Sequence, residues 1–447
     1  MKILKRSLLL LLTIVILIVV INYPKLNIIA GYSAKSMNSS VFLAERPVAF
    51  TDSTDNNFSP INLGTDKVYK ASKTTTASVF GLLTRKAFYR EGLGSVLIDD
   101  DFDTSLKVRV PKRSIPDNTT AFPYGNADQK DTIFSSVDYS KLNTSVANLF
   151  TNNTKTRAVV VLHKNQIIAE QYETGFTKNS RILGWSMTKS IMSTVFGVMQ
   201  HQKKINILDK APILEWQNDE RKNITINDLL HMNSGLEWDE NYNEISDVTK
   251  MLFLEKNMAK QQAQKEFVGK PNETWNYSSG TSNLLSGIIR SKFDTHQAYL
   301  DYWYTDFVDK IGMNSMVIET DMSGNYVGSS YAWATPRDWA KFGLLHLNKG
   351  KWSGKQLFNE EWVNYITRPT NGSNGTYGGH FWLNAEGQFP DVPKTMFYAS
   401  GYQGQFVFVF PDQDLVVVRM GLAHININEF LKEILESIKQ ITVDLEK

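Results

Sequence analysis

The sequence predicts an α/β protein in which helices flank an antiparallel sheet, built from both chain ends, that carries an inserted, mainly helical lobe. Two hairpin patterns, one on each side of a helical stretch, lead to this prediction. In the first, the apolar runs 158–162 and 167–170 flank the turn residues Lys164 and Asn165. Short runs rich in β-branched residues on both sides of a two-residue turn are typical of paired strands.

The second hairpin lies near the end of the chain. Mostly apolar, β-branched and aromatic runs at 404–410 and 415–420 are separated by Pro411-Asp412-Gln413-Asp414, which has the composition of a turn. Between the hairpins, residues 224–290 carry mostly helical patterns, and 428–441 predicts an amphipathic terminal helix. One sheet can therefore collect strands from both sides of a helical insertion, and a cleft between two such lobes is a usual place for an active site.

Length and composition restrict the class of protein. With 447 residues, 42% of them hydrophobic and 21% charged, the chain has room for a large core and more than one domain. A net charge of +2 gives no field that would attract nucleic acid, so no nucleic-acid partner is expected. The absence of cysteine excludes disulfides, a thiolate nucleophile and cysteine-type zinc sites. Because the 7 histidines lack paired spacing, neither a metal nor a cofactor is expected.

The first residues have the pattern of a membrane-targeting segment. Lys2, Lys5 and Arg6 precede the apolar stretch Leu8–Ile21, which a single threonine interrupts. Residues 1–24 are therefore predicted to be a signal peptide or, because no clean cleavage site follows, an uncleaved signal anchor. Basic flanking residues stay in the cytoplasm, so the rest of the chain would be exported to the periplasmic or extracellular face and would contact the membrane through this segment only. The alternative is a buried core helix.

The composition changes after this segment. Residues 25–150 are predicted to form an N-terminal extension that wraps the neighbouring domain, because up to about residue 130 they are rich in Ser, Thr, Asn and Asp with only short apolar patches. Residues 151–447, which hold both hairpins and the helical stretch, are predicted to form the catalytic domain.

One serine of the chain, Ser186, has a lysine three residues after it, Lys189. Residues three apart share a face of a helix, and this pair opens a helical pattern that extends to Gln200. A serine needs a neighbouring base to become a nucleophile, and a helix N-terminus supplies N–H groups and a positive dipole end that favour an oxyanion. The pattern thus indicates a serine hydrolase whose base is a lysine. The alternative is an ordinary N-cap serine beside a solvated lysine.

Two other segments have the composition of parts of the same site. Residues 275–280 precede an apolar run, which places Tyr277 on a loop just before a helix, where a phenol can relay protons. Residues 399–405 enter a strand, and glycines at a strand edge allow a substrate to approach the backbone closely. Outside these segments, Asp338 is predicted to cap the helix that begins near it, and His231 is predicted to pack in the interior.

With these three segments in this order, the sequence resembles the serine β-lactamase and penicillin-binding protein superfamily, whose S-x-x-K signature matches 186–189. The resemblance is closest to the class C-like branch, and within it to the aminohexanoate-dimer (nylon-oligomer) hydrolases. It extends from about Arg157 to Gly421 and includes four further similar segments, 229–236, 277–283, 334–343 and 350–354. The resemblance implies a β-lactamase/transpeptidase-like fold.

The resemblance also implies roles for individual residues. Ser186 would be the acylated nucleophile, Lys189 its base, and Tyr277 the residue that shuttles the proton to the leaving group. The backbone N–H groups of Ser186 and Gln405 would form the oxyanion hole. Four residues of the second and third segments would contact the substrate: Ser279, Tyr402, Gln403 and Gly404.

Two motifs depart from the class C pattern. Where that class has Tyr-x-Asn, this chain has Tyr277-Ser278-Ser279, which lacks the amide that binds the acyl side chain. Where it has Lys-Thr-Gly, this chain has Tyr402-Gln403-Gly404, which lacks the cation suited to the carboxylate of a β-lactam or a D-alanine terminus. The expected substrate is therefore a small molecule with a less acidic amide or ester bond. The alternatives are a D-alanyl-D-alanine carboxypeptidase or β-lactamase, and a non-catalytic envelope binding protein with the same fold.

Overall fold

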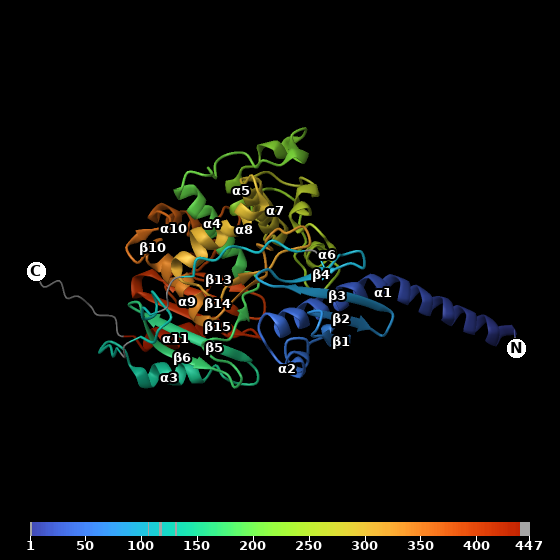
Figure 1. Cartoon of the computed structure of the whole chain (residues 1–447), viewed down its shortest axis with the longest axis horizontal. Coiled ribbons are helices and arrows are strands. Elements are labelled where there is room, and N and C mark those ends of the chain that lie inside the picture. Colours follow the sequence, from blue (N-terminus) through green and yellow to red (C-terminus); the bar gives the residue numbers. More distant parts are fainter. Residues whose placement is uncertain (1, 106, 116–118, 130–131, 439–447) are drawn as a thin grey trace, which may run out of the picture. The chain divides into compact units, whose positions relative to one another are not determined.

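The computed structural model describes residues 2–105, 107–115, 119–129 and 132–438. These residues form two compact units, whose elements are labelled in Figure 1. As far as they are described, residues 1–108, 239–258 and 320–324 belong to the first unit and residues 109–238, 259–319 and 325–447 to the second. The domain boundaries at 24 and 150, and the wrapping role of the segment between them, stay predictions.

The first unit is built on a four-stranded antiparallel sheet in the order β1-β2-β3-β4. Its strands are β1 (Gly64–Tyr69), β2 (Thr74–Val79), β3 (Leu83–Arg90) and β4 (Gly94–Ile98), and its helices are α1 (Lys2–Phe42), α2 (Val48–Ser53), η1 (Ile61–Leu63) and α6 (Asp247–Leu254). Ala34 of α1 shares one buried cluster with Ala77 of β2 and Ala87 of β3. Small side chains therefore allow the second half of α1 to pack closely on the sheet.

α1 is a single helix that continues past Pro24. Its apolar beginning, from Leu4 to Ile21, is exposed, whereas Ile29 and the following turns are buried within the first unit. Among the described residues, α1 is the one helix long and apolar enough to cross a membrane. The exposed beginning is consistent with a signal anchor, and it does not fit the alternative of a buried core helix.

The second unit contains a six-stranded antiparallel sheet in the order β12-β13-β14-β15-β5-β6. In chain order its strands are β5 (Thr156–His163), β6 (Gln166–Tyr172), β12 (Trp382–Leu383), β13 (Phe397–Gly401), β14 (Gln405–Phe410) and β15 (Leu415–Gly421). β15 pairs with β5, so that Val417 lies opposite Val161. The predicted sheet from both sides of an insertion is confirmed, and so are both predicted hairpins, β5-β6 and β14-β15.

Helices cover both faces of this sheet (Figure 1). α3 (Tyr139–Ala147) and α11 (Ile427–Glu436) share a buried cluster with side chains of β5, β14 and β15. α4 (Met187–His201) packs against β13 and β14, and α9 (Pro336–Leu347) packs against β14, β15 and β5. A Cβ on Gly343 of α9 would lie 2.6 Å from a methyl of Val416 and 2.7 Å from one of Val407, so a glycine is needed for this close approach. α11 corresponds to the predicted terminal helix 428–441, whose last residues lie outside the described part.

The insertion between β6 and β12 is mainly helical, as predicted. Besides α4, α6 and α9, its helices are η2 (Leu214–Trp216), η3 (Glu220–Asn223), α5 (Ile226–Leu230), η4 (Met258–Lys260), η5 (Gln262–Gln264), α7 (Ser279–Ser291), α8 (His296–Trp303), η6 (Tyr304–Val308), η7 (Asp309–Ile311) and α10 (Glu360–Ile366). Its short strands are β7 (Ile182–Leu183), β8 (Val317–Ile318), β9 (Ala332–Ala334), β10 (Lys351–Trp352) and β11 (Lys355–Gln356), and η8 (Pro411–Gln413) follows β14. β7, β9 and β8 form a small sheet in that order.

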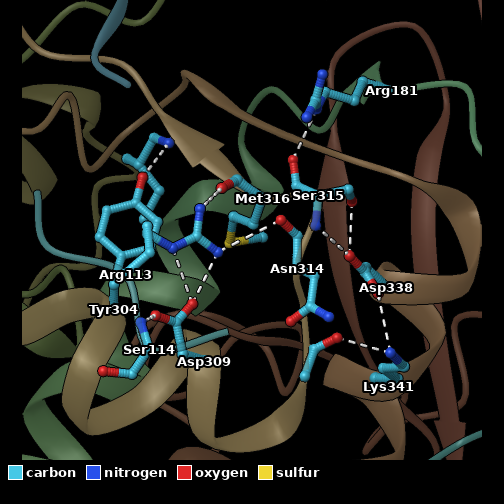
Figure 2. A network of polar contacts seen from close by, with 12 residues as sticks. Arg113, Ser114, Arg181, Tyr304, Asp309, Asn314, Ser315, Met316, Asp338 and Lys341 are labelled. Atoms are coloured by element: carbon cyan, nitrogen blue, oxygen red, sulfur yellow. Dashed lines mark hydrogen bonds and ion pairs between the residues drawn. The ribbon is translucent and has the colours of Figure 1, made fainter. Parts of the chain in front are cut away.

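A polar network ties this small sheet to α9 (Figure 2). Arg181, which precedes β7, donates to the carbonyl of Ser315 at 2.8 Å. The hydroxyl of Ser315 donates to Asp338 at 2.6 Å, and the carboxylate of Asp338 lies 3.3 Å from Nζ of the fully buried Lys341. Because β7 leads into Ser186, the network fixes the strand that precedes the candidate nucleophile.

The prediction that Asp338 caps α9 was wrong. Thr335 is the N-cap, and its hydroxyl accepts from the N–H of Asp338 at 3.2 Å. The carboxylate of Asp338 instead accepts from Ser315, as described above. Sequence reasoning chose the acidic residue of the segment, whereas the N-cap lies three residues earlier at a threonine, which is also among the preferred caps.

Gly343→Ala is expected to destabilise the second unit, although alanine favours a helix over glycine by about 1 kcal/mol. The added methyl would meet the side chains of Val416 and Val407, and overpacking of a filled core costs about 1–3 kcal/mol. The midpoint of thermal unfolding should therefore fall. In a Val416→Ala background, which makes room for the methyl, the same change should cost less. An equal loss in both backgrounds would show that steric packing is not the cause.

Candidate active site

Ser186 lies at the N-terminus of α4, directly after a sharp turn. Trp185, which forms this turn, has a φ of +48°, a conformation that a bulky residue adopts only under strain. Two contacts hold it there: its carbonyl accepts from the hydroxyl of Thr188 at 2.7 Å, and its ring meets that of Tyr402 edge-on at 5.7 Å. This strained turn places Ser186 at the start of α4.

The hydroxyl of Ser186 does not cap α4, because its side chain makes no capping hydrogen bond. It accepts instead from Nζ of Lys189 at 3.0 Å. Lys189 is 1% exposed. The alternative of an N-cap serine beside a solvated lysine is therefore wrong. Ser186 itself is partly exposed.

Among the described residues, the hydrogen-bond partners of Nζ of Lys189 include three oxygen atoms. Besides Ser186, they are the hydroxyl of Ser279 at 2.9 Å and the carbonyl of Ser329 at 3.0 Å. A neutral amine has two hydrogens and one lone pair, and the carbonyl of Ser329 can only accept. If the amine is neutral, one of the two hydroxyls can donate to its lone pair. The geometry thus allows transfer of a proton from Ser186 to Lys189.

Tyr277 lies on the loop before α7, as predicted, and the next residue, Ser278, caps that helix. Its ring packs edge-on against Tyr377 with 5.7 Å between centroids and lies 5.3 Å from the ring of Trp382. Nζ of Lys189 lies 4.9 Å from the centroid of the Tyr277 ring. The second segment therefore meets the first at Lys189.

A glycine of the third segment lies close to the turn that precedes Ser186. A Cβ on Gly401, at the end of β13, would lie 2.1 Å from the carbonyl oxygen of Gly184, so no larger residue fits there. Gln403 and Gly404 then turn the chain with φ of +62° and +82°. The turn between β13 and β14 is thus held next to the residues that precede Ser186.

Gln405 begins β14 directly after this turn. Its side chain accepts from the N–H of Gly421 at 3.1 Å and donates to the carbonyl of Tyr402 at 3.1 Å. The side chain is therefore occupied within the fold, and its bonds fix the backbone of Gln405.

Arg419 of β15 supports the turn from within the protein. It is fully buried, and its guanidinium donates to the carbonyls of Gly404 at 2.7 Å and Ala423 at 2.8 Å and to the hydroxyl of Thr156 at 2.9 Å. Burial lowers the pKa of Arg419 to about 9. Within the described part of the chain no carboxylate pairs with it, so backbone and hydroxyl oxygens balance its charge.

Sequence reasoning missed Arg419. The available signal was a charged residue inside an otherwise apolar strand pattern, Leu415–Gly421. An arginine in such a run is almost never fully buried unless polar groups surround it.

His380 lies behind Lys189 and links three segments. Its Nδ1 contacts the carbonyl of Leu230, its Nε2 lies 3.0 Å from the hydroxyl of Ser282 on α7, and its own carbonyl accepts from Ser190 on α4 at 2.7 Å. Burial lowers the pKa of His380 to about 3, so the ring is neutral. His380 is therefore a packing element between α4 and α7.

Comparisons with known proteins agree with this geometry. A family model described as Beta-lactamase matches residues 146–421, which is more than half of the chain. This protein belongs to the β-lactamase family. The resemblance and the fold predicted from the sequence are thereby confirmed.

Among solved structures, a candidate 6-aminohexanoate-dimer hydrolase from Bacillus anthracis is similar with 21% identity and a TM-score of 0.56, over 66% of this chain and 81% of that one. A penicillin-binding protein homologue from Caulobacter crescentus is similar with 11% identity and a TM-score of 0.51, over 69% and 99%. A family VIII carboxylesterase is similar with 14% identity and a TM-score of 0.50, over 69% and 98%. At these identities the likeness shows the fold.

Arg419→Met is expected to destabilise the second unit by roughly 3 kcal/mol, because it leaves the carbonyls of Gly404 and Ala423 without their donors. Arg419→Lys should cost less, since it keeps one cation near these oxygens. The measurement is the midpoint of thermal unfolding, with Arg368→Met, at an exposed arginine, as the control. A loss no greater than that of the control would contradict the supporting role of Arg419.

The stability of the second unit is expected to fall as the pH is lowered from 7 to 5. Burial lowers the pKa of His231 and His346 to about 4 and that of His380 to about 3, below the 6.5 of an unfolded histidine. The unfolded chain therefore binds protons in this range that the folded unit does not, and each histidine removes up to about 1.4 kcal/mol per pH unit.

The contribution of one histidine can be isolated with His346→Phe, since His346 lies among aromatic rings. The difference in thermal unfolding midpoint between pH 7 and pH 5 should shrink in this variant. His201→Gln, at an exposed histidine, serves as the control. An unchanged difference in His346→Phe would show that proton uptake by this residue does not set the pH dependence.

Proposed function

We propose that this protein is a serine hydrolase that cleaves an amide or ester bond of a small molecule through an acyl-enzyme on Ser186. The observation that carries the proposal is the 3.0 Å separation between the hydroxyl of Ser186, which has no capping role, and Nζ of the buried Lys189. Family membership supports the class of reaction, because proteins of this fold include one named as a 6-aminohexanoate-dimer hydrolase and one named as a carboxylesterase.

In the proposed mechanism, neutral Lys189 takes the proton of the Ser186 hydroxyl while Oγ bonds to the carbonyl carbon of the substrate. The negative charge that develops on the carbonyl oxygen accepts hydrogen bonds from the backbone N–H groups of Ser186 and Gln405, each worth about 3–4 kcal/mol in the transition state. Tyr277 passes this proton from Lys189 to the departing amine or alcohol as its bond to carbon breaks, which leaves Lys189 neutral. Lys189 then takes a proton from water as the water oxygen bonds to the acyl carbon, and it returns that proton to Ser186 as the ester bond breaks.

Ser279 has a positioning role in this proposal. Its hydroxyl lies 2.9 Å from Nζ of Lys189, and the residue is fully buried. The substrate contact that the resemblance implied for Ser279 is therefore replaced by orientation of the amine. Tyr402 and Gln403 are partly exposed on the third segment and keep their proposed contact with the substrate. Gly404 is buried, and a Cβ on it would lie 2.4 Å from the guanidinium of Arg419, so the substrate contact that the resemblance implied for Gly404 is replaced by close packing on Arg419.

The charge distribution at the third segment favours an uncharged acyl group over a carboxylate. Tyr402-Gln403-Gly404 carries no cation, and the nearby guanidinium of Arg419 is fully buried and occupied by protein oxygens. A β-lactam or a D-alanine terminus would bring a carboxylate to this place without a cationic partner. A neutral amide or ester is the better substrate class.

The proposal includes attachment to a membrane through the exposed apolar beginning of α1. Lys5 and Arg6 precede this apolar segment, and positive residues of that kind remain on the cytoplasmic side. The chain after α1 would then be exported, with the candidate site on the periplasmic or extracellular face.

The test is covalent labelling of the full chain with a fluorophosphonate probe and, separately, with penicillin, followed by measurement of intact mass. Wild type is expected to gain one probe, and Ser186→Ala none. Lys189→Met, with its base removed, should react about 10²–10⁴-fold more slowly. Ser190→Ala is the matched control, because this serine lies one turn further along α4 and its hydroxyl is bound to the carbonyl of His380.

The other outcomes separate the alternatives. A stoichiometric penicillin adduct on Ser186 would favour a carboxypeptidase or β-lactamase. A folded sample that gains no adduct from either compound would favour the non-catalytic binding protein.

A further inference from the structure

α1 passes without a linker from an exposed apolar segment into the core of the first unit. The residues from Leu4 to Ile21 are all exposed, and Ile29 and Ala30, two turns beyond Ile21, are buried. In Figure 1 this part of α1 projects from its unit as a free rod. Whatever holds the projecting segment therefore also fixes the distance of the first unit from it.

The apolar stretch of α1 is short for a membrane. At 1.5 Å per residue, Leu8–Ile21 is about 21 Å long, whereas the hydrocarbon core of a bilayer is about 30 Å thick. Lys5 and Arg6 limit the stretch on one side. The rest of the hydrocarbon thickness must therefore be spanned by the helical turns after Ile21, which begin with Asn22 and Tyr23.

The turn between β2 and β3 lies beside the part of α1 that follows Ile21. It consists of Phe80, Gly81 and Leu82, and the hydroxyl of Tyr23 donates to the carbonyl of Leu82 at 3.3 Å. One turn further along α1, Leu26 and Ile29 share a cluster with Val79 and Leu83, the residues on either side of this turn. The turn is thus fixed to the helix beside the end of the exposed apolar stretch.

The side chains of the turn are apolar and unusually exposed. Phe80 is 69% exposed and Leu82 is 56% exposed, and Tyr23 beside them is 44% exposed. Phe80 also has a φ of +53°, a region that a bulky aromatic residue rarely occupies. These three side chains continue the apolar surface of α1, and packing within the unit does not account for them.

Cationic groups follow on the side away from the apolar stretch. Lys25 is exposed, and the guanidinium of Arg85 on β3 donates to the side chain of Asn27 on α1 at 2.6 Å. In α1 and in the β2-β3 hairpin, exposed apolar side chains are therefore followed by a cationic side chain, in the same direction along the helix. This order matches a bilayer, in which lipid phosphates lie just outside the hydrocarbon core and aromatic rings favour the boundary.

We propose that the turn formed by Phe80, Gly81 and Leu82 inserts into the outer boundary of the same bilayer that α1 spans, with Tyr23 beside it. The occupant of this surface is the lipid bilayer, because the surface is continuous with the exposed apolar side of α1 and lies beside the turns of the helix that follow Ile21. The inference rests on the proposed membrane attachment of α1. The first unit would then lie at the membrane surface, attached through α1 and through this turn.

The absence of cysteine allows a direct test on the full chain. Single cysteines at Phe80→Cys and Leu82→Cys carry an NBD fluorophore, and the protein is reconstituted into vesicles of phosphatidylcholine and phosphatidylglycerol. Ala71→Cys is the matched control, because it is exposed on the turn at the other end of β2, about 20 Å away. Val15→Cys, in the middle of the apolar stretch, reports on α1 itself.

The labels at residues 80 and 82 are expected to emit at shorter wavelength than the label at 71 and to be quenched severalfold more by lipids with a nitroxide near the headgroup. The label at residue 15 should be quenched most by a nitroxide deep in the acyl chain. If residue 15 is quenched and residues 80 and 82 behave like residue 71, the turn does not insert and the inference fails alone. If residue 15 is not quenched, membrane attachment fails and the inference fails with it.

Discussion

The amine of Lys189 is buried at 1% exposure, and the candidate site is arranged around it. A polar group without water must find its hydrogen-bond partners in the protein. Here they come from the start of α4, the start of α7 and the segment before β9, through Ser186, Ser279 and Ser329. Each of these elements must therefore hold its serine within hydrogen-bond distance of Nζ of Lys189. Several contacts in the second unit fix the positions of these elements.

Three contacts of different kinds hold the segments around Lys189 in place. A close glycine contact, Gly401 to Gly184, holds the third segment beside the turn before Ser186, where a side chain on Gly401 would collide with a carbonyl. Arg419 holds the backbone beyond that turn with a buried guanidinium. His380 joins α4 to α7 as a neutral ring. None of the three needs to contact a substrate, and each restricts where the reacting groups lie.

The first unit is organised around α1, a helix that is exposed at its beginning and buried at its end. α1 changes its surroundings between Ile21 and Ile29 without a break in the helix. The sheet β1-β4 packs on the buried half through alanines, and the aromatic and aliphatic tip of one hairpin extends toward the exposed half. The four strands of this sheet come from residues 64–98, a region of polar composition with short apolar patches.

Local pattern in the sequence determined the kind and order of the elements. The β5-β6 hairpin, the β14-β15 hairpin and α4 were predictable because a period of two or 3.6 residues and a turn composition are visible within about ten residues. The three motif segments were visible for the same reason. The cap of α9 was not, since a threonine and an aspartate three residues apart are both preferred at that position.

Tertiary structure alone decided which atoms meet. The hydroxyl of Ser279 and the carbonyl of Ser329 lie 90 and 140 positions from Lys189 in the chain, and no local pattern relates them. The same holds for Arg419, whose partners come from Thr156, Gly404 and Ala423. A sequence states which residues are able to form a site, but the burial and partners of each one depend on how distant segments pack, and packing is a property of the whole fold.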